Sequence, residues 1–147
     1  MTFEELQQKV GEVIGVSDWF VMGQDRINLF ADATEDHQFI HVDPERASQT
    51  PFGQTIAHGF LSLSMLAVFV ETAMPSLPSD MTVNYGLDKV RFLAPVKSDK
   101  RIRGHITLGD LTEKRPGQWQ VTLAVSVEIE GEDKPALVAD WILMMFA

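Results

Sequence analysis

The stretch that decides the fold is GFLSLSMLAVFV, residues 59–70, which contains no charged residue and only two polar ones, both serines. We expect one helix from Gly59 to Met74, ended by Pro75 and Pro78, because proline cannot continue a helix. A helix that is apolar all round must be buried on all sides. The rest of the chain therefore has to supply a layer that surrounds it.

The sequence after this helix has the two-residue period of β-strands. Apolar and polar residues alternate from Arg101 to Leu108 and from Gln118 to Glu130, with turn residues between the two runs. A further strand is expected from Thr82 to Val96, bent at Gly86, and the last run, Leu137 to Phe146, is apolar on both faces. One apolar helix followed by antiparallel strands predicts an α+β protein with the hot-dog fold, whose sheet wraps around a central helix.

The segment before the helix contains two helical patterns and a long irregular stretch. Thr2 and Glu5 have the spacing of a capping box, which predicts an amphipathic helix from Phe3 to Val10. A helical pattern also runs from Asp25 to Ala33, and the polar stretch from Thr34 to Thr55 is expected to be a loop. A loop of that length in a compact domain usually serves a function.

Size and composition restrict the class of protein. A chain of 147 residues with 45% hydrophobic and 22% charged residues predicts one globular domain, residues 1–147. A net charge of −9 argues against binding nucleic acid, and the absence of cysteine excludes disulfides and thiolate metal sites. The first residues have no basic start, and the longest apolar stretch is shorter than the roughly 20 residues of a membrane span. We therefore expect a cytoplasmic protein with neither nucleic acid nor membrane as partner.

The irregular stretch carries the first candidate catalytic residues. Asp36 lies five residues before His41, and in a loop the two side chains can converge on one water molecule. A carboxylate and an imidazole on one water suit general acid–base catalysis at the two ends of a double bond. From the spacing alone, an aspartate that caps a turn and a histidine that belongs to the core is the better interpretation.

Gly59 adds a second candidate element, because it lies where the apolar helix begins. The first N–H groups of a helix have no internal partner, and a glycine allows a ligand carbonyl to approach the backbone closely. These are the requirements of an oxyanion hole. The alternative is that Gly59 only permits close helix packing.

Several motifs together resemble one family. They are Asp36, His41, Asp43-Pro44 and His58-Gly59, with the fragments VSDWF at residues 16–20, DRI at 25–27, PFG at 51–53, IAHGF at 56–60 and VRFLAPV at 90–96. This combination is similar to the MaoC-like, (R)-specific enoyl-CoA hydratase family and, within it, to the nodulation protein N-like branch. The similarity covers most of the chain.

The resemblance implies a reaction and a set of roles. Asp36 and His41 would activate water for syn addition to a trans-2-enoyl thioester, or for the reverse dehydration of a 3-hydroxyacyl thioester. The N–H of Gly59 would hold the thioester oxygen as it becomes an enolate. The acyl group would be carried by coenzyme A or a carrier protein, and no metal or redox cofactor is implied. Which proton each of the two residues handles is left open.

The sequence also departs from the family pattern. Gln38 and Phe39 occupy positions where many members have asparagine and proline, and Ala67 stands where some hydratases have a serine. Gln38 is a candidate supporting residue, as is His58, whose other possible role is to hydrogen-bond the start of the helix. The shape of the pocket is expected to depend on the packing of four residues, Phe39, Phe52, Phe60 and Met65.

Half of the 12 lysines and arginines gather between residues 89 and 103. On so acidic a chain, this cluster is a candidate site for the phosphates of coenzyme A or of a carrier-protein arm. Its candidate phosphate-binding residues are Arg91, Lys97, Arg101 and Arg103. The alternative is the charged outer face of an exposed strand.

The sequence is also compatible with other functions. Acyl thioesterases with this fold usually place a catalytic carboxylate on the central helix, whereas residues 59–70 offer none and Glu71 follows near the far end. A non-catalytic acyl-binding or signalling protein is a further alternative. Because the run from Leu137 to Phe146 is apolar on both faces, we also expect a homodimer with its acyl tunnel between subunits.

Overall fold

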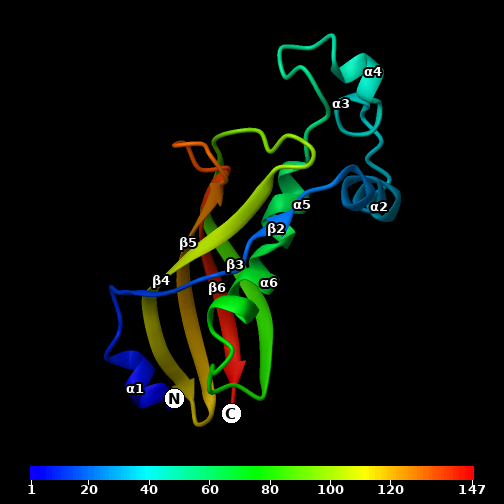
Figure 1. Cartoon of the computed structure of the whole chain (residues 1–147). Coiled ribbons are helices and arrows are strands. Elements are labelled where there is room, and N and C mark those ends of the chain that lie inside the picture. The colour runs from blue at the N-terminus through cyan, green and yellow to red at the C-terminus, as the bar shows by residue number, and fades with distance from the viewer.

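An antiparallel sheet of six strands organises the computed structural model, which describes residues 1–147 (Figure 1). The strands are β1 (Val13–Val16), β2 (Phe20–Val21), β3 (Met81–Phe92), β4 (Arg101–Arg115), β5 (Gln118–Ile129) and β6 (Leu137–Phe146). Their order is β1-β4-β5-β6-β3, and β2 pairs with β4 off this path. The two ends of this path, β1 and β3, are therefore the edges of the sheet.

Six helices accompany the sheet. They are α1 (Phe3–Gln7), α2 (Gln24–Thr34), α3 (Phe39–Val42), α4 (Pro44–Ala47), α5 (Gly59–Ser64) and α6 (Leu66–Ala73). Figure 1 shows α5 and α6 lying along the sheet, whereas α2, α3 and α4 gather beyond one of its ends. None of the helices has the length and apolar character that a membrane crossing requires.

The core forms where the α5–α6 segment packs on the sheet. Phe69 of α6 is fully buried, and Gly104 of β4 makes room for it, because a Cβ at Gly104 would lie 2.8 Å from the Cβ of Phe69. Buried and half-buried residues alternate from Ile102 to Leu108 of β4 and along all of β5, as the two-residue period predicts. This sheet around an apolar helical segment confirms the predicted hot-dog fold.

The central helical segment differs from the prediction in two ways. It is two helices and not one, because α5 ends at Ser64 and the backbone N–H of Met65 lies 3.2 Å from the carbonyls of both Leu61 and Ser62. It is also not covered on all sides within one chain, since Phe60 is 69% exposed. The expectation of complete burial inside the chain is therefore wrong.

Other predicted elements are present with different bounds or additional structure. The first helix ends at Gln7, short of the predicted Val10, and the predicted loop between Thr34 and Thr55 contains α3 and α4. The predicted bend of β3 coincides with a shift of its register against β6 at Gly86. β6 lies inside the sheet, and most of its outward side chains are only half-buried, so no second layer covers that face.

Candidate active site

The segment between α2 and α5 brings the two predicted catalytic residues together. After α2 ends, Glu35 adopts a left-handed conformation, φ 62°, that turns the chain at Asp36. His41 follows within α3 and not in a loop as predicted, and the N–H of Ile56 donates to the carbonyl of Ile40 at 3.0 Å. This hydrogen bond joins the segment that precedes α5 to the helix that carries His41.

Hydrogen bonds fix both the backbone and the ring of His41. The side-chain amide of Gln24 donates to the His41 carbonyl at 2.7 Å. Nδ1 of the His41 ring lies 2.7 Å from the carbonyl oxygen of Ile56. Because a carbonyl oxygen only accepts hydrogen bonds, Nδ1 must carry the proton. Nε2 of the neutral ring therefore carries a lone pair and is free to accept a proton.

His58 stacks against His41 and supports Asp36. The two imidazoles lie 3.9 Å apart between centroids at an interplanar angle of 23°, and Phe30 packs 4.9 Å from His58. Nε2–H of His58 donates to the carbonyl of Asp36 at 3.0 Å. The predicted alternative, a hydrogen bond from His58 to the start of α5, is not made. Nδ1 of His58 is buried without a partner, so a third polar atom faces this site.

The polar atoms of the site converge. A carboxylate oxygen of Asp36 and one ring nitrogen each of His41 and His58 all lie within 4.8 Å of one another. A zinc ion would need the ligand lone pairs to point at one position about 2.0–2.1 Å from each histidine nitrogen. The rings of His41 and His58 are stacked nearly parallel, so their nitrogen lone pairs lie in two neighbouring planes and do not meet at one position. A water molecule tolerates the longer distances and wider angles, so the arrangement suits a bound water better than a metal ion.

Burial lowers the pKa of His41 below its ordinary value of 6.5, because the charged ring would lose its hydration. The neighbouring His58 lowers this pKa further, while the Ile56 carbonyl and Asp36 act in the opposite direction. The net shift keeps His41 neutral at pH 7. A neutral, oriented imidazole beside an exposed carboxylate can serve as a general base.

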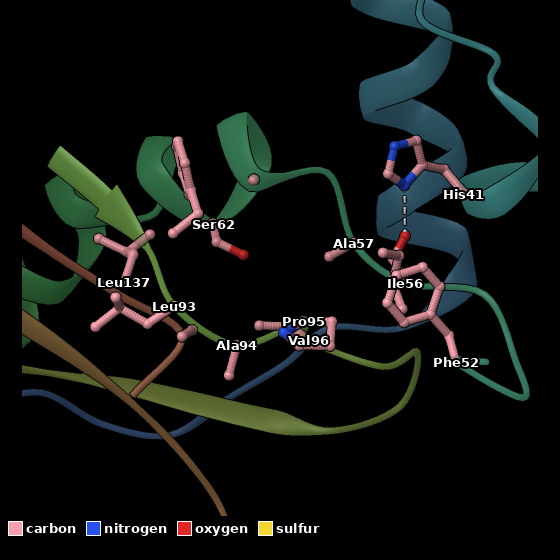
Figure 2. Close-up of a pocket in the computed structure, with 13 residues that line it drawn as sticks. His41, Phe52, Ile56, Ala57, Ser62, Leu93, Ala94, Pro95, Val96 and Leu137 are labelled. Atoms are coloured by element: carbon pink, nitrogen blue, oxygen red, sulfur yellow. Dashed lines mark hydrogen bonds between the residues drawn. The ribbon is translucent and has the colours of Figure 1, made fainter. Parts of the chain in front are cut away.

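An apolar cavity of about 260 Å³ opens beside His41 (Figure 2). Its lining comes from the segment before α5, from α5 itself, from the end of β3 and the residues after it, and from the start of β6. The lining residues are His41, Phe52, Ile56, Ala57, Gly59, Ser62, Phe92, Leu93, Ala94, Pro95, Val96, Ala136 and Leu137. His41 and Ser62 carry the only polar side chains of this set.

Gly59 lies on the wall of this cavity. Its backbone N–H donates to no group of the chain. A Cβ built on Gly59 would lie 2.9 Å from the ring of Phe92, which is closer than a carbon contact allows. Phe92 therefore packs directly on the backbone at this glycine.

The structure separates several other predicted residues from the cavity. Gln38 precedes α3 with an exposed side chain that caps no helix. Of the four residues expected to shape the pocket, only Phe52 lines it. Phe39 packs under the guanidinium of Arg46 at 4.2 Å, Phe60 is exposed, and Met65 is buried elsewhere in the core.

The predicted phosphate-binding residues do not form one free cluster. Arg103 donates to Glu128 at 2.7 Å, and Arg101 forms an ion pair with Glu130. Both guanidinium groups also lie over the ring of Trp19. Arg91 is exposed and donates to a backbone carbonyl, and Lys97 is half-buried. None of the four lines the cavity.

Most of the cavity wall was not foreseen from the sequence. Leu93, Ala94 and Leu137 reach it only through the pairing of β3 with β6, which no local pattern specifies. The position of Ser62 on the cavity wall could have been predicted from the sequence. Ser62 follows Gly59 by three residues and therefore lies on the same face of the helix.

Comparison with known proteins places the chain in a family. A family model described as MaoC like domain matches residues 5–131. The chain is 46% identical to nodulation protein N of Rhizobium leguminosarum bv. viciae, over 99% of this chain and 91% of that protein. It is also 46% identical to 3-hydroxyacyl-thioester dehydratase Z of Mycobacterium tuberculosis (strain ATCC 25618 / H37Rv), over 99% of each chain.

The fold has a solved counterpart as well. The (R)-hydratase from A. caviae involved in PHA biosynthesis superposes with a TM-score of 0.74 at 23% identity, over 90% of this chain and 95% of that one. The sequence comparisons give the family, and the superposition gives the same fold. The chain therefore belongs to the MaoC-like family of hydratases and dehydratases and, within it, to the branch that contains nodulation protein N.

Proposed function

We propose that the protein hydrates trans-2-enoyl thioesters to (R)-3-hydroxyacyl thioesters, or catalyses the reverse dehydration. The observation that carries this proposal is the convergence of Asp36, His41 and His58 beside an apolar cavity. Acid–base groups at one end and an apolar wall at the other match a thioester whose reacting double bond continues into an acyl chain. The (R) stereochemistry rests on the resemblance to the (R)-specific hydratases.

In this reaction Asp36 and His41 hold one water near the β-carbon of the substrate. The water oxygen bonds to that carbon and its proton passes to the pair, where the lone pair of His41 Nε2 favours His41 as the acceptor. The electrons of the double bond move to the thioester oxygen, which the N–H of Gly59 stabilises. The pair then returns a proton to the α-carbon on the same face.

The proposed chemistry defines its substrate and cofactor needs. The cavity is apolar apart from two side chains and suits an acyl chain, which coenzyme A or a carrier protein would deliver. No metal or redox cofactor is required, because the thioester itself receives the electrons of the double bond. A relative named 3-hydroxyacyl-thioester dehydratase Z, which is 46% identical over nearly the full length, supports this reaction class.

The alternative functions have less support. A thioesterase would need a carboxylate on the central helix, and Glu71 borders a separate hollow together with Ala67 and Thr82. A non-catalytic acyl-binding protein would have no use for an oriented, neutral His41 beside Asp36. An assay with an enoyl-CoA distinguishes all three possibilities by its product: hydrated thioester, free coenzyme A, or none.

We further propose that the protein is a homodimer joined through β3. This strand is a sheet edge whose residues are almost all exposed, including apolar ones such as Val83 and Tyr85. Phe60 of α5 is exposed too, and a hollow lies between it and Tyr85. A second copy that pairs its own β3 would cover the edge, the apolar side chains and the helix side left open.

The dimer can be tested with one substitution at each edge of the sheet. Val83→Glu on β3 is expected to dissociate the dimer, because an interface of more than ~1,000 Å² would then contain an unpaired charge. Val13→Glu on β1, at the opposite edge, is the matched control and should leave the dimer intact. Sedimentation equilibrium at micromolar concentration measures both. A fully active wild-type monomer would contradict the proposal.

Loss of either catalytic group is expected to reduce turnover strongly. Asp36→Asn and His41→Gln should each lower hydration of crotonyl-CoA by at least ~100-fold, since acid–base groups typically contribute ~10²–10⁴-fold. Because His41 is buried and hydrogen-bonded, His41→Gln should also lower the free energy of unfolding by about 1–3 kcal/mol. Asp36 is exposed, so Asp36→Asn should not.

The same segment offers matched controls for these two variants. Asp32 and His37 form an exposed pair 2.8 Å apart, outside the cavity lining. Asp32→Asn and His37→Gln should keep wild-type turnover. Near-normal rates for folded Asp36→Asn or His41→Gln would refute the proposed chemistry.

The acid limb of kcat/KM is expected below pH 6.5. His41 must be neutral to accept a proton, and its lowered pKa keeps it neutral to a lower pH than an unperturbed histidine. Between the folded and unfolded pKa values the unfolded chain binds more protons, so stability should fall as the pH drops through that window. A rate profile together with an NMR titration of the His41 ring tests this. A ring that titrates at or above pH 6.5 would disagree.

Gly59→Ala is expected to lower kcat by at least ~10-fold, because the new Cβ displaces Phe92 and crowds the approach of the thioester oxygen. The double variant Gly59→Ala with Phe92→Ala separates these effects. Removing the Phe92 ring relieves its clash with the new Cβ. A kcat that stays low in the double variant would therefore show that the Cβ hinders the approach of the thioester oxygen to Gly59. Wild-type kinetics for a folded Gly59→Ala protein would exclude Gly59 from the site.

A further inference from the structure

Ser62 is a buried polar residue with no partner in the chain. It is 3% exposed, and its hydroxyl points into the cavity beside His41 (Figure 2). Ser64 on the same helix behaves differently, because its hydroxyl donates to the carbonyl of Phe60 at 2.7 Å. That bond is the usual one for a serine within a helix. The hydroxyl of Ser62 makes no such bond and is available to a ligand.

The surroundings of Ser62 restrict what this ligand group can be. His41 is the only other polar side chain on the wall, and its Nδ1–H already donates to Ile56. An apolar chain that filled the cavity would cut this hydroxyl off from water without giving it a partner, which is unfavourable. A ligand that fills the cavity is therefore expected to place an oxygen or nitrogen near Ser62.

We propose that the hydroxyl of Ser62 donates a second hydrogen bond to the thioester oxygen of the bound acyl group, beside the N–H of Gly59. This inference rests on the hydratase function proposed above. Ser62 follows Gly59 by three residues on α5, so both lie on one helical face, and both line the cavity. Side chains of a helix tilt toward its N-terminus, which directs the hydroxyl toward the level of Gly59.

This second donor acts when negative charge forms on the oxygen. As water adds to the β-carbon, the electrons of the double bond move to the thioester oxygen and give an enolate, which collapses when the α-carbon takes a proton. A hydrogen bond to that oxygen is stronger in the enolate than in the substrate. Ser62 should therefore affect kcat more than KM.

The first test compares the two serines of α5. Ser62→Ala is expected to lower kcat for crotonyl-CoA by at least ~10-fold and to change KM by less than about 3-fold. Ser64→Ala, which removes a hydroxyl bonded to the backbone, should keep both values. A normal kcat for Ser62→Ala overturns the proposal, and so does an effect confined to KM, which would place the hydroxyl on another part of the substrate.

A second pair of variants controls for packing. Ser62→Thr keeps the hydroxyl, whereas Ser62→Val has the same shape without it. The threonine variant should exceed the valine variant in kcat by at least ~10-fold. Equal rates for the two variants would show that shape alone matters at this position and would overturn the proposal.

A spectroscopic measurement examines the hydrogen bond itself. The conjugated chromophore of 2,4-hexadienoyl-CoA absorbs at longer wavelength when its carbonyl oxygen is polarised. Bound to the inactive Asp36→Asn protein it should show a red shift, which should shrink when Ser62→Ala is added. A red shift that is unchanged by Ser62→Ala contradicts the proposed hydrogen bond from Ser62 but leaves the proposed hydratase function standing. A wild-type protein that hydrates no enoyl thioester instead refutes the proposed function, and this inference with it.

Discussion

The packing of the α5–α6 segment on the concave face of the sheet determines the rest of the structure. Phe69 inserts against β4 where Gly104 leaves room for its ring, and the buried residues of both elements close around this contact. Burying one such aromatic side chain contributes about 1.5–3 kcal/mol, so the segment cannot shift along the sheet without a large loss. The start of α5 is thereby held at one end of the sheet.

The candidate site is built at this fixed point. His58 and Gly59 lie at the start of α5, and the preceding residue, Ala57, is held by a hydrogen bond to Val96 at 2.7 Å. The segment with Asp36 and His41 is then placed by its bonds to Ile56 and His58. The core thus provides the apolar wall, and an outlying segment provides the acid–base groups. In the proposed reaction, the water and the acyl chain would meet where these two parts join.

The sequence predicted the parts with a local signal. The apolar helix and the alternation in β4 and β5 follow from periodicity, and the pair Asp36 and His41 follows from a motif in one short segment. The stacking of His41 on His58 and the wall formed by Leu93 and Leu137 depend on contacts between distant segments, which no local pattern contains. The prediction that the helix is covered on all sides failed within one chain, because Phe60 lies exposed beside a hollow at the edge strand β3. Arg101 and Arg103 were predicted to bind phosphate from their charge alone. Charge does not reveal that Glu130 pairs with Arg101 and Glu128 with Arg103.

The central claim is that Asp36 and His41 add water to an enoyl thioester on one face of its double bond. Hydration of crotonyl-CoA in D₂O, followed by NMR and chiral analysis of the product, tests this claim most directly. We expect (R)-3-hydroxybutyryl-CoA with the deuterium at the α-carbon added syn to the new hydroxyl. Release of free coenzyme A, the (S) product, anti addition or no reaction would contradict it.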